Sequence, residues 1–119
     1  ARFPDVPDHK GNLAQVESAL GVRLALMGRL DEALEVAEHG LLLQEEALDQ
    51  AGGSAGHRRA LAQRRAEFAL VLAVADDVES ARELVESARA LEGYDPALWR
   101  TGVEFADLEA RARDAGLEL

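Results

Sequence analysis

The histidine, carboxylate and serine side chains of this 119-residue sequence are its candidates for chemistry. His9, His39 and His57 lie in separate segments, and because the sequence has no cysteine, no spacing typical of a zinc site occurs. The many carboxylates are expected on solvated helix faces, and no serine lies in a nucleophile motif. The glycine-rich stretch 52–56 lacks the Lys-Ser/Thr end of a phosphate-binding loop. We therefore expect no enzyme activity, no metal ion and no cofactor.

A basic segment that starts at His57 is the second group of functional side chains. Its arginines stand out because the whole chain has a formal net charge of −10. They are Arg58, Arg59, Arg64 and Arg65. One interpretation is that they bind an acidic peptide, a phosphate or a neighbouring domain. The alternative is that they pair with local acids at the end of the preceding helix. These acids are Glu45, Glu46 and Asp49.

Charge and composition narrow the partners and the compartment. The acidic balance argues against nucleic acid, because affinity for it rests on neutralised phosphates. No apolar run approaches the roughly 20 residues that span a membrane, and no signal-peptide pattern opens the chain, so we expect a cytoplasmic protein. The single lysine among 13 basic residues is typical of a GC-rich bacterial genome. Because the chain opens at Ala1 rather than Met, we expect a piece of a larger protein.

The elements expected to position these side chains are α-helices. Leucine, alanine, glutamate and arginine dominate and aromatic residues are only 4%, which favours helix over sheet. Apolar residues spaced three and four apart, with glycine or aspartate between the segments, predict five helices. The expected helices are 13–27, 31–51, 57–75, 78–92 and 96–115. Two prolines predict an extended lead-in over 1–12, and 13–119 form one domain.

The first and last helices have predicted buried faces. In the first helix Gly28 ends the pattern, Asp31 caps the next helix, and a second apolar face lies beside the main stripe. The main stripe is Leu13, Val16, Leu20, Leu24 and Met27, and the second face is Val22, Ala25 and Leu26. The face expected for the last helix is Leu98, Trp99, Val103, Ala106 and Ala110.

An internal repeat with a shift of 48 residues relates the two halves of the chain. Repeat one is 13–51, repeat two is 57–92, and a capping helix over 96–115 follows. Small residues recur where two antiparallel helices must cross closely, and a turn residue recurs between them. The matched pairs are Gly28 with Asp76, Ala33 with Ala81, Ala37 with Val85 and Gly40 with Ala88.

The repeat resembles a known family. The spacing is Leu20-Gly21-x2-Leu24-x3-Gly28-x4-Ala33-x3-Ala37-x2-Gly40-Leu41, and Phe68-Ala69-x2-Leu72-x3-Asp76-x4-Ala81-x3-Val85-x2-Ala88 repeats it. This resembles the tetratricopeptide repeat (TPR) over about residues 13–92 and implies an all-α, right-handed solenoid of helical hairpins. No proline follows Leu41, and the period is 48 instead of the usual ~34. Lengthened repeats of this kind look like those of large bacterial regulators and signalling ATPases.

The resemblance also implies a binding surface, because the family's first helices line a concave groove. Most of the matching residues are apolar and surplus to one buried stripe, so we expect an apolar groove for a partner helix or extended segment. The residues carried over are Gln15, Ser18, Val22, Ala25 and Leu26, and Gln63, Ala66, Leu70, Ala73 and Val74. A Lys and Asn carboxylate clamp used by some family members is not expected. The positions that match the clamp residues are occupied here by Ser18, Val22, Ala66 and Leu70.

The sequence therefore favours a protein-interaction module or scaffold within a larger bacterial regulatory or signalling protein. Three alternatives stay open. The same apolar surface could be covered by the last helix or the lead-in, or could be buried in a homodimer. The domain could also sense a signal peptide or another small ligand.

Overall fold

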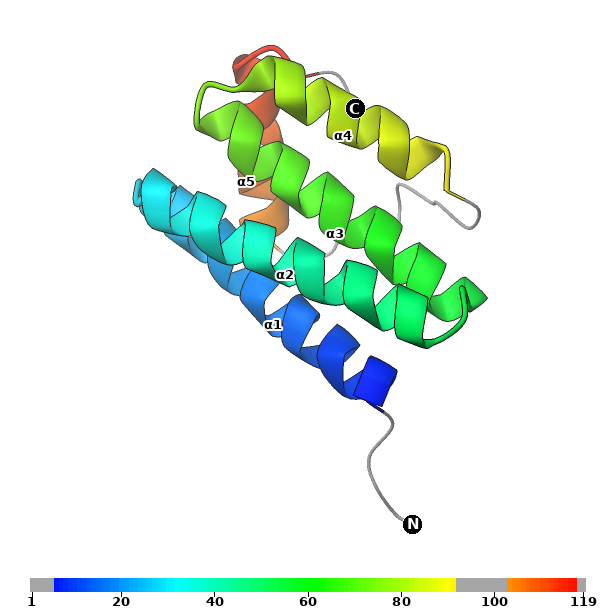
Figure 1. Ribbon diagram of the computed structural model, residues 1–119. Helices are drawn as coiled ribbons and strands as arrows, with labels where there is room; N and C mark the ends of the chain where they lie inside the picture. Colours follow the sequence, from blue (N-terminus) through cyan, green and yellow to red (C-terminus); the bar gives the residue numbers. More distant parts are fainter. Residues whose placement is uncertain (1–5, 92–102, 118–119) are drawn as a thin grey trace.

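The computed structural model describes residues 6–91 and 103–117, and this part of the chain is all-helical (Figure 1). Helices α1 to α4 run alternately up and down, each packed against the next, so that α1 and α3 run parallel and also touch. Helix α5 contacts both α1 and α3. The all-α prediction is confirmed for the described residues. The helices are α1 (Val6–Leu26), α2 (Leu30–Gln50), α3 (Ala55–Val74), α4 (Val78–Arg89) and α5 (Val103–Asp114).

The start of α1 corrects the predicted lead-in. Residues 6–12 were expected to be extended, yet α1 begins at Val6. Pro7 is compatible with this because it lies in the first turn, where the missing amide proton has no intrahelical acceptor. The added turns are held by the next helix, since Lys10 Nζ lies 2.9 Å from Glu46 Oε2. Residues 1–5 lie outside the described part.

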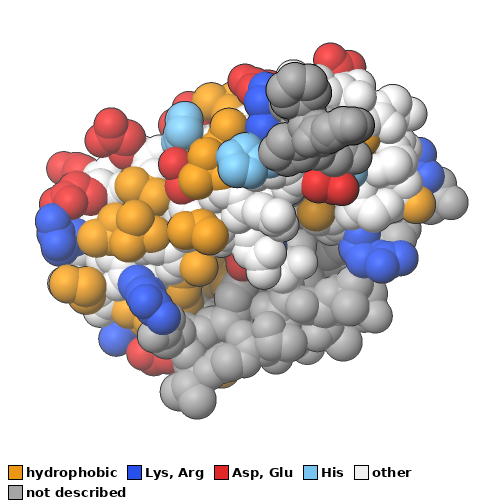
Figure 2. Space-filling view, turned by 90° about the horizontal axis from the view of Figure 1, so that it is seen from below, with side chains coloured by type: hydrophobic (Ala, Val, Ile, Leu, Met, Phe, Trp, Pro, Cys, Tyr) orange, Lys and Arg blue, Asp and Glu red, His pale blue; other side chains and the backbone are white. Residues whose placement is uncertain are grey.

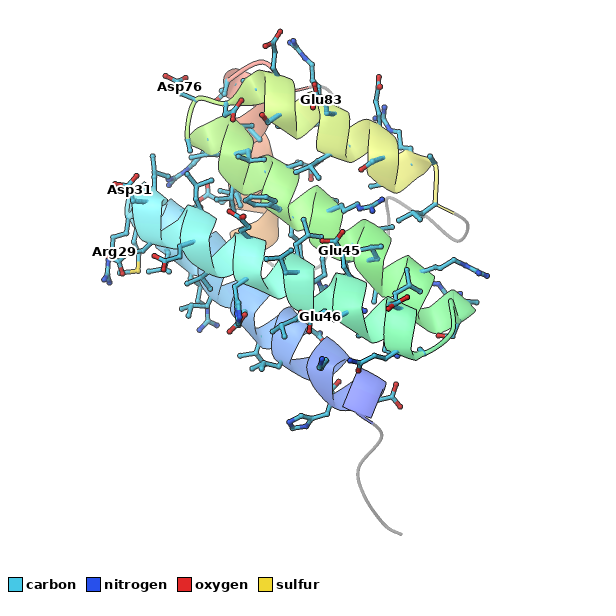
Figure 3. All side chains as sticks on the ribbon, in the orientation of Figure 1. Arg29, Asp31, Glu45, Glu46, Asp76 and Glu83 are labelled. Atoms are coloured by element: carbon cyan, nitrogen blue, oxygen red, sulfur yellow. The ribbon has the colours of Figure 1, made fainter. Side chains whose placement is uncertain are left out.

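The two hairpin turns repeat at the level of the backbone. Gly28 and Asp76, which the 48-residue shift equates, have φ angles of +80° and +73°. The backbone N–H of Arg29 donates to the carbonyl five residues back at 2.9 Å, and that of Asp77 does the same at 2.9 Å. Both turns are therefore Schellman caps with a left-handed residue at the same place. Figure 3 shows Arg29, Asp31 and Asp76 at this shared end of the hairpins.

The helix starts differ between the two hairpins. Asp77 caps α4, because its Oδ1 accepts from the Ser80 N–H at 3.2 Å. Asp31 does not cap α2 as predicted, since α2 starts one residue earlier with Arg29 at the cap position. Asp31 instead lies in the first turn, where its charge still favours the positive helix end.

Small residues set the crossing of α1 and α2, as the sequence predicted. A Cβ added to Gly21 would lie 3.0 Å from the Ala37 Cβ and 3.3 Å from the Ala33 carbonyl oxygen. A Cβ on Gly40 would lie 3.1 Å from the Ala14 carbonyl oxygen. The two backbones therefore approach so closely that a side chain larger than hydrogen would push them apart.

The predicted buried face of α1 is wrong. Leu13, Val16, Leu20 and Met27 are exposed by 44%, 64%, 46% and 66%, and only Leu24 of the predicted stripe is buried. The face that packs is the one with small side chains, because those allow the close approach to α2. It includes Ala14, Ser18, Gly21, Val22 and Ala25. The larger apolar residues consequently face outward, and Figure 2 shows hydrophobic side chains gathered on the lower side of the molecule.

The buried face of α5 also differs from the prediction. Ala106 and Ala110 are exposed, whereas Leu108 and Ala112 are fully buried. These two residues are four apart and thus share one side of the helix. That side belongs to the same core as α1 and α3. Leu98 and Trp99, and residues 96–102 of the predicted capping helix, lie outside the described residues.

Candidate functional site

The ten predicted groove residues lie on α1 and α3, but most of them are covered. Six are buried to at least 96%: Ser18, Val22, Ala25, Ala66, Leu70 and Ala73. Leu26, Gln63 and Val74 are partly buried, and only Gln15 is exposed. The apolar members of this set are therefore core residues in this fold, which corrects the expected open apolar groove.

Helix α5 covers the apolar end of this face. Leu70 and Val22 share one core cluster with Leu108 of α5. Arg111 of α5 also donates from Nη1 to the Leu26 carbonyl oxygen at 3.3 Å. A helix of the same chain thus covers the apolar surface at the carboxyl ends of α1 and α3. Coverage by the last helix was one of the alternatives left open by the sequence.

A polar cleft lies toward the amino ends of α1 and α3 and has a volume of about 520 Å³. It includes Gln15 and Gln63 of the predicted groove and Arg64 of the basic segment. Four carboxamide side chains border it, and we call it the amide cleft. Its residues are Asp8, Gly11, Asn12, Gln15, Gln44, Ser54, Gly56, His57, Ala60, Gln63 and Arg64.

Gln44, His57 and Asp8 form a chain of hydrogen bonds along one wall of the amide cleft. Gln44 Nε2 lies 3.2 Å from His57 Nδ1, and His57 Nε2 lies 2.9 Å from Asp8 Oδ1. A neutral imidazole satisfies both bonds when Nδ1 accepts from the amide and Nε2–H donates to the carboxylate. Gly11 makes room for this arrangement, since a Cβ there would lie 3.3 Å from His57 Cε1.

The Gln44 carbonyl oxygen is the unusual atom of the cleft. Gln44 is fully buried, and its Oε1 has no hydrogen-bond partner among the described residues. Buried acceptors are nearly always paired in folded proteins, because an unpaired one costs roughly 1–3 kcal/mol. Gly11 packs against this amide, since a Cβ there would lie 3.7 Å from the oxygen, so the unpaired acceptor lies behind the wall of the cleft.

A buried ion pair lies beside the cleft, which Arg64 lines. Arg64 Nε lies 2.6 Å from Glu67 Oε1, and the Ser18 hydroxyl donates to the same oxygen at 2.9 Å. The three residues are exposed by 8% or less. The guanidinium is therefore neutralised within the fold, and the cleft does not present it as an unpaired cation.

The arginines of the basic segment do not form one patch. Arg64 is buried in the pair just described. Arg58 Nη1 donates to the Gly53 carbonyl at 2.6 Å, at the start of α3. Arg65 Nη1 donates across to the Ser87 carbonyl of α4 at 3.4 Å. Arg59 is exposed. The segment thus serves packing on several sides and does not form a single anion surface.

The chain matches no protein-family model, no curated protein and no solved structure. Within residues 6–91 and 103–117, no three His, Asp or Glu side chains are placed to hold a metal ion. Helices with the length and hydropathy needed to cross a bilayer are absent from the same ranges.

Sequence reasoning missed Gln44, Asp8 and Asn12 as cleft residues. Gln44 carried a usable signal, because it follows Ala37, Gly40 and Leu41 at helical spacing and is thus a polar side chain in a buried stripe. Asp8 and Asn12 carried none, since the segment before residue 13 was expected to be extended.

Proposed function

We propose that the chain is a protein-interaction module that binds an extended peptide segment in the amide cleft. The observation that carries this proposal is the row of carboxamides, from Asn12, Gln15 and Gln63, that borders the cleft. The proposal moves the ligand away from the apolar groove expected from the sequence. The apolar end is closed by α5, and the polar end is hollow.

Carboxamides suit a peptide backbone because each offers a donor and an acceptor, as does each peptide unit. Asn12, Gln15 and Gln63 border the cleft from α1 and α3, and Gln44 borders it from α2. Since Arg64 is already neutralised by Glu67, the cleft favours an uncharged peptide backbone over an anion.

The experiment is a selection from a random 12-residue peptide library displayed on phage. Selected peptides are labelled, and their affinities are measured by fluorescence anisotropy. Gln15→Ala/Gln63→Ala removes two accessible amides, so we expect affinity to fall about thirtyfold, at roughly 1 kcal/mol for each hydrogen bond. Gln44 is left intact because it is buried and supports His57.

A matched control separates the cleft from the rest of the surface. Leu42 lies on α2 at a different cleft, with Phe68 and Leu84, so Leu42→Ala should leave peptide affinity unchanged. The proposal fails if selected peptides bind the Gln15→Ala/Gln63→Ala variant as tightly as the parent chain.

A small-ligand sensor is the second candidate, and the size of the cleft favours it. A volume of about 520 Å³ lies within the range of small-molecule pockets, roughly 300–1,000 Å³. A ligand that fills it should raise the melting temperature in proportion to the logarithm of its concentration. A thermal-shift screen with short peptides and small polar compounds decides between the two candidates.

The wider setting is also part of the proposal. Two hairpins with the same Schellman turn, 48 residues apart, support a TPR-like helical repeat. The arginine-rich composition supports a bacterial source, and we infer a cytoplasmic regulatory or signalling protein that uses the module to bind a protein partner. The proposal includes no catalytic step.

A further inference from the structure

An apolar groove lies over α3, between α2 and α4, and its described lining residues are all different from those of the amide cleft. Figure 1 shows α3 with α2 on one side and α4 on the other. The groove has a volume of about 570 Å³. We call it the α2–α4 groove, and side chains from all three helices give it an apolar lining. These are Leu41, Leu42, Phe68, Leu72 and Leu84.

Much of this apolar lining remains in contact with water. Leu42 is 49% exposed, and Phe68, Leu72 and Leu84 are only partly buried. Transfer of such surface out of water is favourable, and apolar side chains gathered in a hollow mark an interaction site more often than scattered single ones do. The groove is therefore a second candidate binding surface of the chain.

Two carboxylates border the groove, Glu38 from α2 and Glu83 from α4. Both are exposed, and neither has a hydrogen bond or an ion pair. Among the described residues, no lysine or arginine lines the groove, and α2 has none in its 21 residues. The groove thus has an apolar floor and negatively charged borders, and the complementary partner carries positive charge beside apolar side chains.

The shape of the groove favours a helix as its occupant. Helices α2 and α4 run in the same direction on either side of α3, so a helix lying along them can pack against all three. Ser80 and Ser87 line the α4 side, and they are about 10 Å apart along the helix axis, or two turns. A helix also satisfies its own backbone hydrogen bonds, which a lining of leucine and phenylalanine does not do for an extended segment.

We propose that the α2–α4 groove binds an amphipathic helix of a partner protein. About two turns of this helix place apolar side chains in the groove, and lysine or arginine side chains flank them toward Glu38 and Glu83. Nucleic acids and anionic lipid surfaces do not suit the groove, because its carboxylates repel them. A second copy of this chain suits it poorly, since each copy has a formal net charge of −10.

The test is a selection of phage-displayed helical peptides on the whole chain. The library is an alanine-rich 18-residue helix, because alanine supports helix formation in a short peptide. Four positions on one side vary among leucine, phenylalanine, methionine and alanine, and four flanking positions vary among arginine, lysine, glutamate and glutamine. We expect large apolar residues to be enriched on the one side, and arginine and lysine over glutamate at the flanks. The most enriched peptide is then labelled for fluorescence anisotropy.

Leu42→Asp tests the apolar lining. It should weaken binding of the enriched peptide at least about tenfold, because it places a carboxylate against apolar side chains of the peptide. Val16→Asp is the matched control, since Val16 of α1 is a 64% exposed apolar residue outside the groove. This control should leave the affinity unchanged. Circular dichroism confirms that both variants remain helical.

Glu38→Gln/Glu83→Gln tests the charged borders. It should weaken binding about fivefold at low salt, because each exposed ion pair contributes little, and it should reduce the salt dependence of the affinity. Asp31→Asn/Glu86→Gln removes the same charge outside the groove and should have a smaller effect.

Three results would overturn the proposal. The first is that no peptide is enriched, or that glutamate is enriched at the flanks. The second is that the enriched peptide binds the Leu42→Asp chain as tightly as the parent. The third is a dimer of the parent chain in sedimentation equilibrium that Leu42→Asp dissociates, which would assign the groove to a second copy. Gln15→Ala/Gln63→Ala should not affect binding of the helix, so this proposal can fail without the amide-cleft proposal failing.

Discussion

At the scale of residues, the buried pair of Arg64 and Glu67 is the most consequential contact between charged groups. Both side chains are nearly free of water, and Ser18 of α1 completes the bonding of the carboxylate. In such a site the attraction between the charges does little more than offset their desolvation. Removing one partner is far more costly, because it leaves the other charge buried and unpaired.

We therefore expect Glu67→Ala to reduce the free energy of unfolding by roughly 3 kcal/mol, measured by urea denaturation. The control is Glu32→Ala, which breaks the exposed pair with Arg29 and should cost less than about 1 kcal/mol. Replacing both partners, as in Arg64→Met/Glu67→Met, should recover most of the loss. Equal effects of Glu67→Ala and Glu32→Ala would show that the pair is solvated.

At the scale of elements, the turns that join the helices carry the clearest backbone requirement. Gly28 and Asp76 occupy equivalent left-handed positions, but only glycine adopts that conformation without a steric penalty. A Cβ at Gly28 would touch nothing within 4 Å, so the conformation alone decides the effect of a substitution there.

Opposite substitutions at the two turns should have opposite effects. We expect Gly28→Ala to destabilise the chain by about 1–2 kcal/mol, and Asp76→Gly to stabilise it by a smaller amount. Gly56 of α3 is the control, since it has open space and no left-handed φ, so Gly56→Ala should stabilise by up to about 1 kcal/mol. Thermal melts of the three variants measure these changes. A loss at Asp76→Gly would mean that the aspartate side chain supports the turn.

The sequence predicted the elements better than their faces. Gly28 and the Asp76–Asp77 pair placed the breaks, and the helices over 30–89 start and end within three residues of the predicted bounds. The face of α1 was not predictable from hydrophobicity. Gly21 and Ser18 contribute little apolar surface themselves, yet they let α2 approach, whereas the larger Leu13 and Val16 face outward. The close packing of α1 and α2 determines which face of α1 is buried, and the hydrophobicity pattern of the sequence does not show how closely two helices pack.

The candidate site was predictable only in part. Gln15 and Gln63 were predicted to line a groove between the helices now seen as α1 and α3. They do line a cleft there, although this cleft is polar and not apolar. Most of the remaining groove residues are core because α5 returns to α1 and α3 and shares one apolar cluster with them. The packing of α5 on these helices depends on Leu108 and Ala112, which are four residues apart and fully buried. The sequence alone did not predict that this side of α5 is the buried one.

At the scale of the whole molecule, α5 determines whether the face of α1 and α3 is open. Leu108 is fully buried in the shared core. We expect Leu108→Ala to cost about 2–5 kcal/mol in urea denaturation, through lost burial and the cavity left behind. Leu42→Ala, at a half-exposed position, should cost much less. If Leu108→Ala left stability unchanged, α5 would not be an integral part of the core.

Two arginines bind backbone carbonyl groups where α5 meets the rest of the fold. Arg111 meets the last carbonyl of α1, and Arg82 Nη2 meets the carbonyl of Gly116, just beyond α5, at 3.2 Å. Carbonyls at helix ends carry partial negative charge, so each guanidinium acts as a built-in counterion. Both arginines are exposed, and dissolved ions compete with them. Added salt should therefore weaken these two contacts, whereas the buried Leu108 continues to hold α5 in the core.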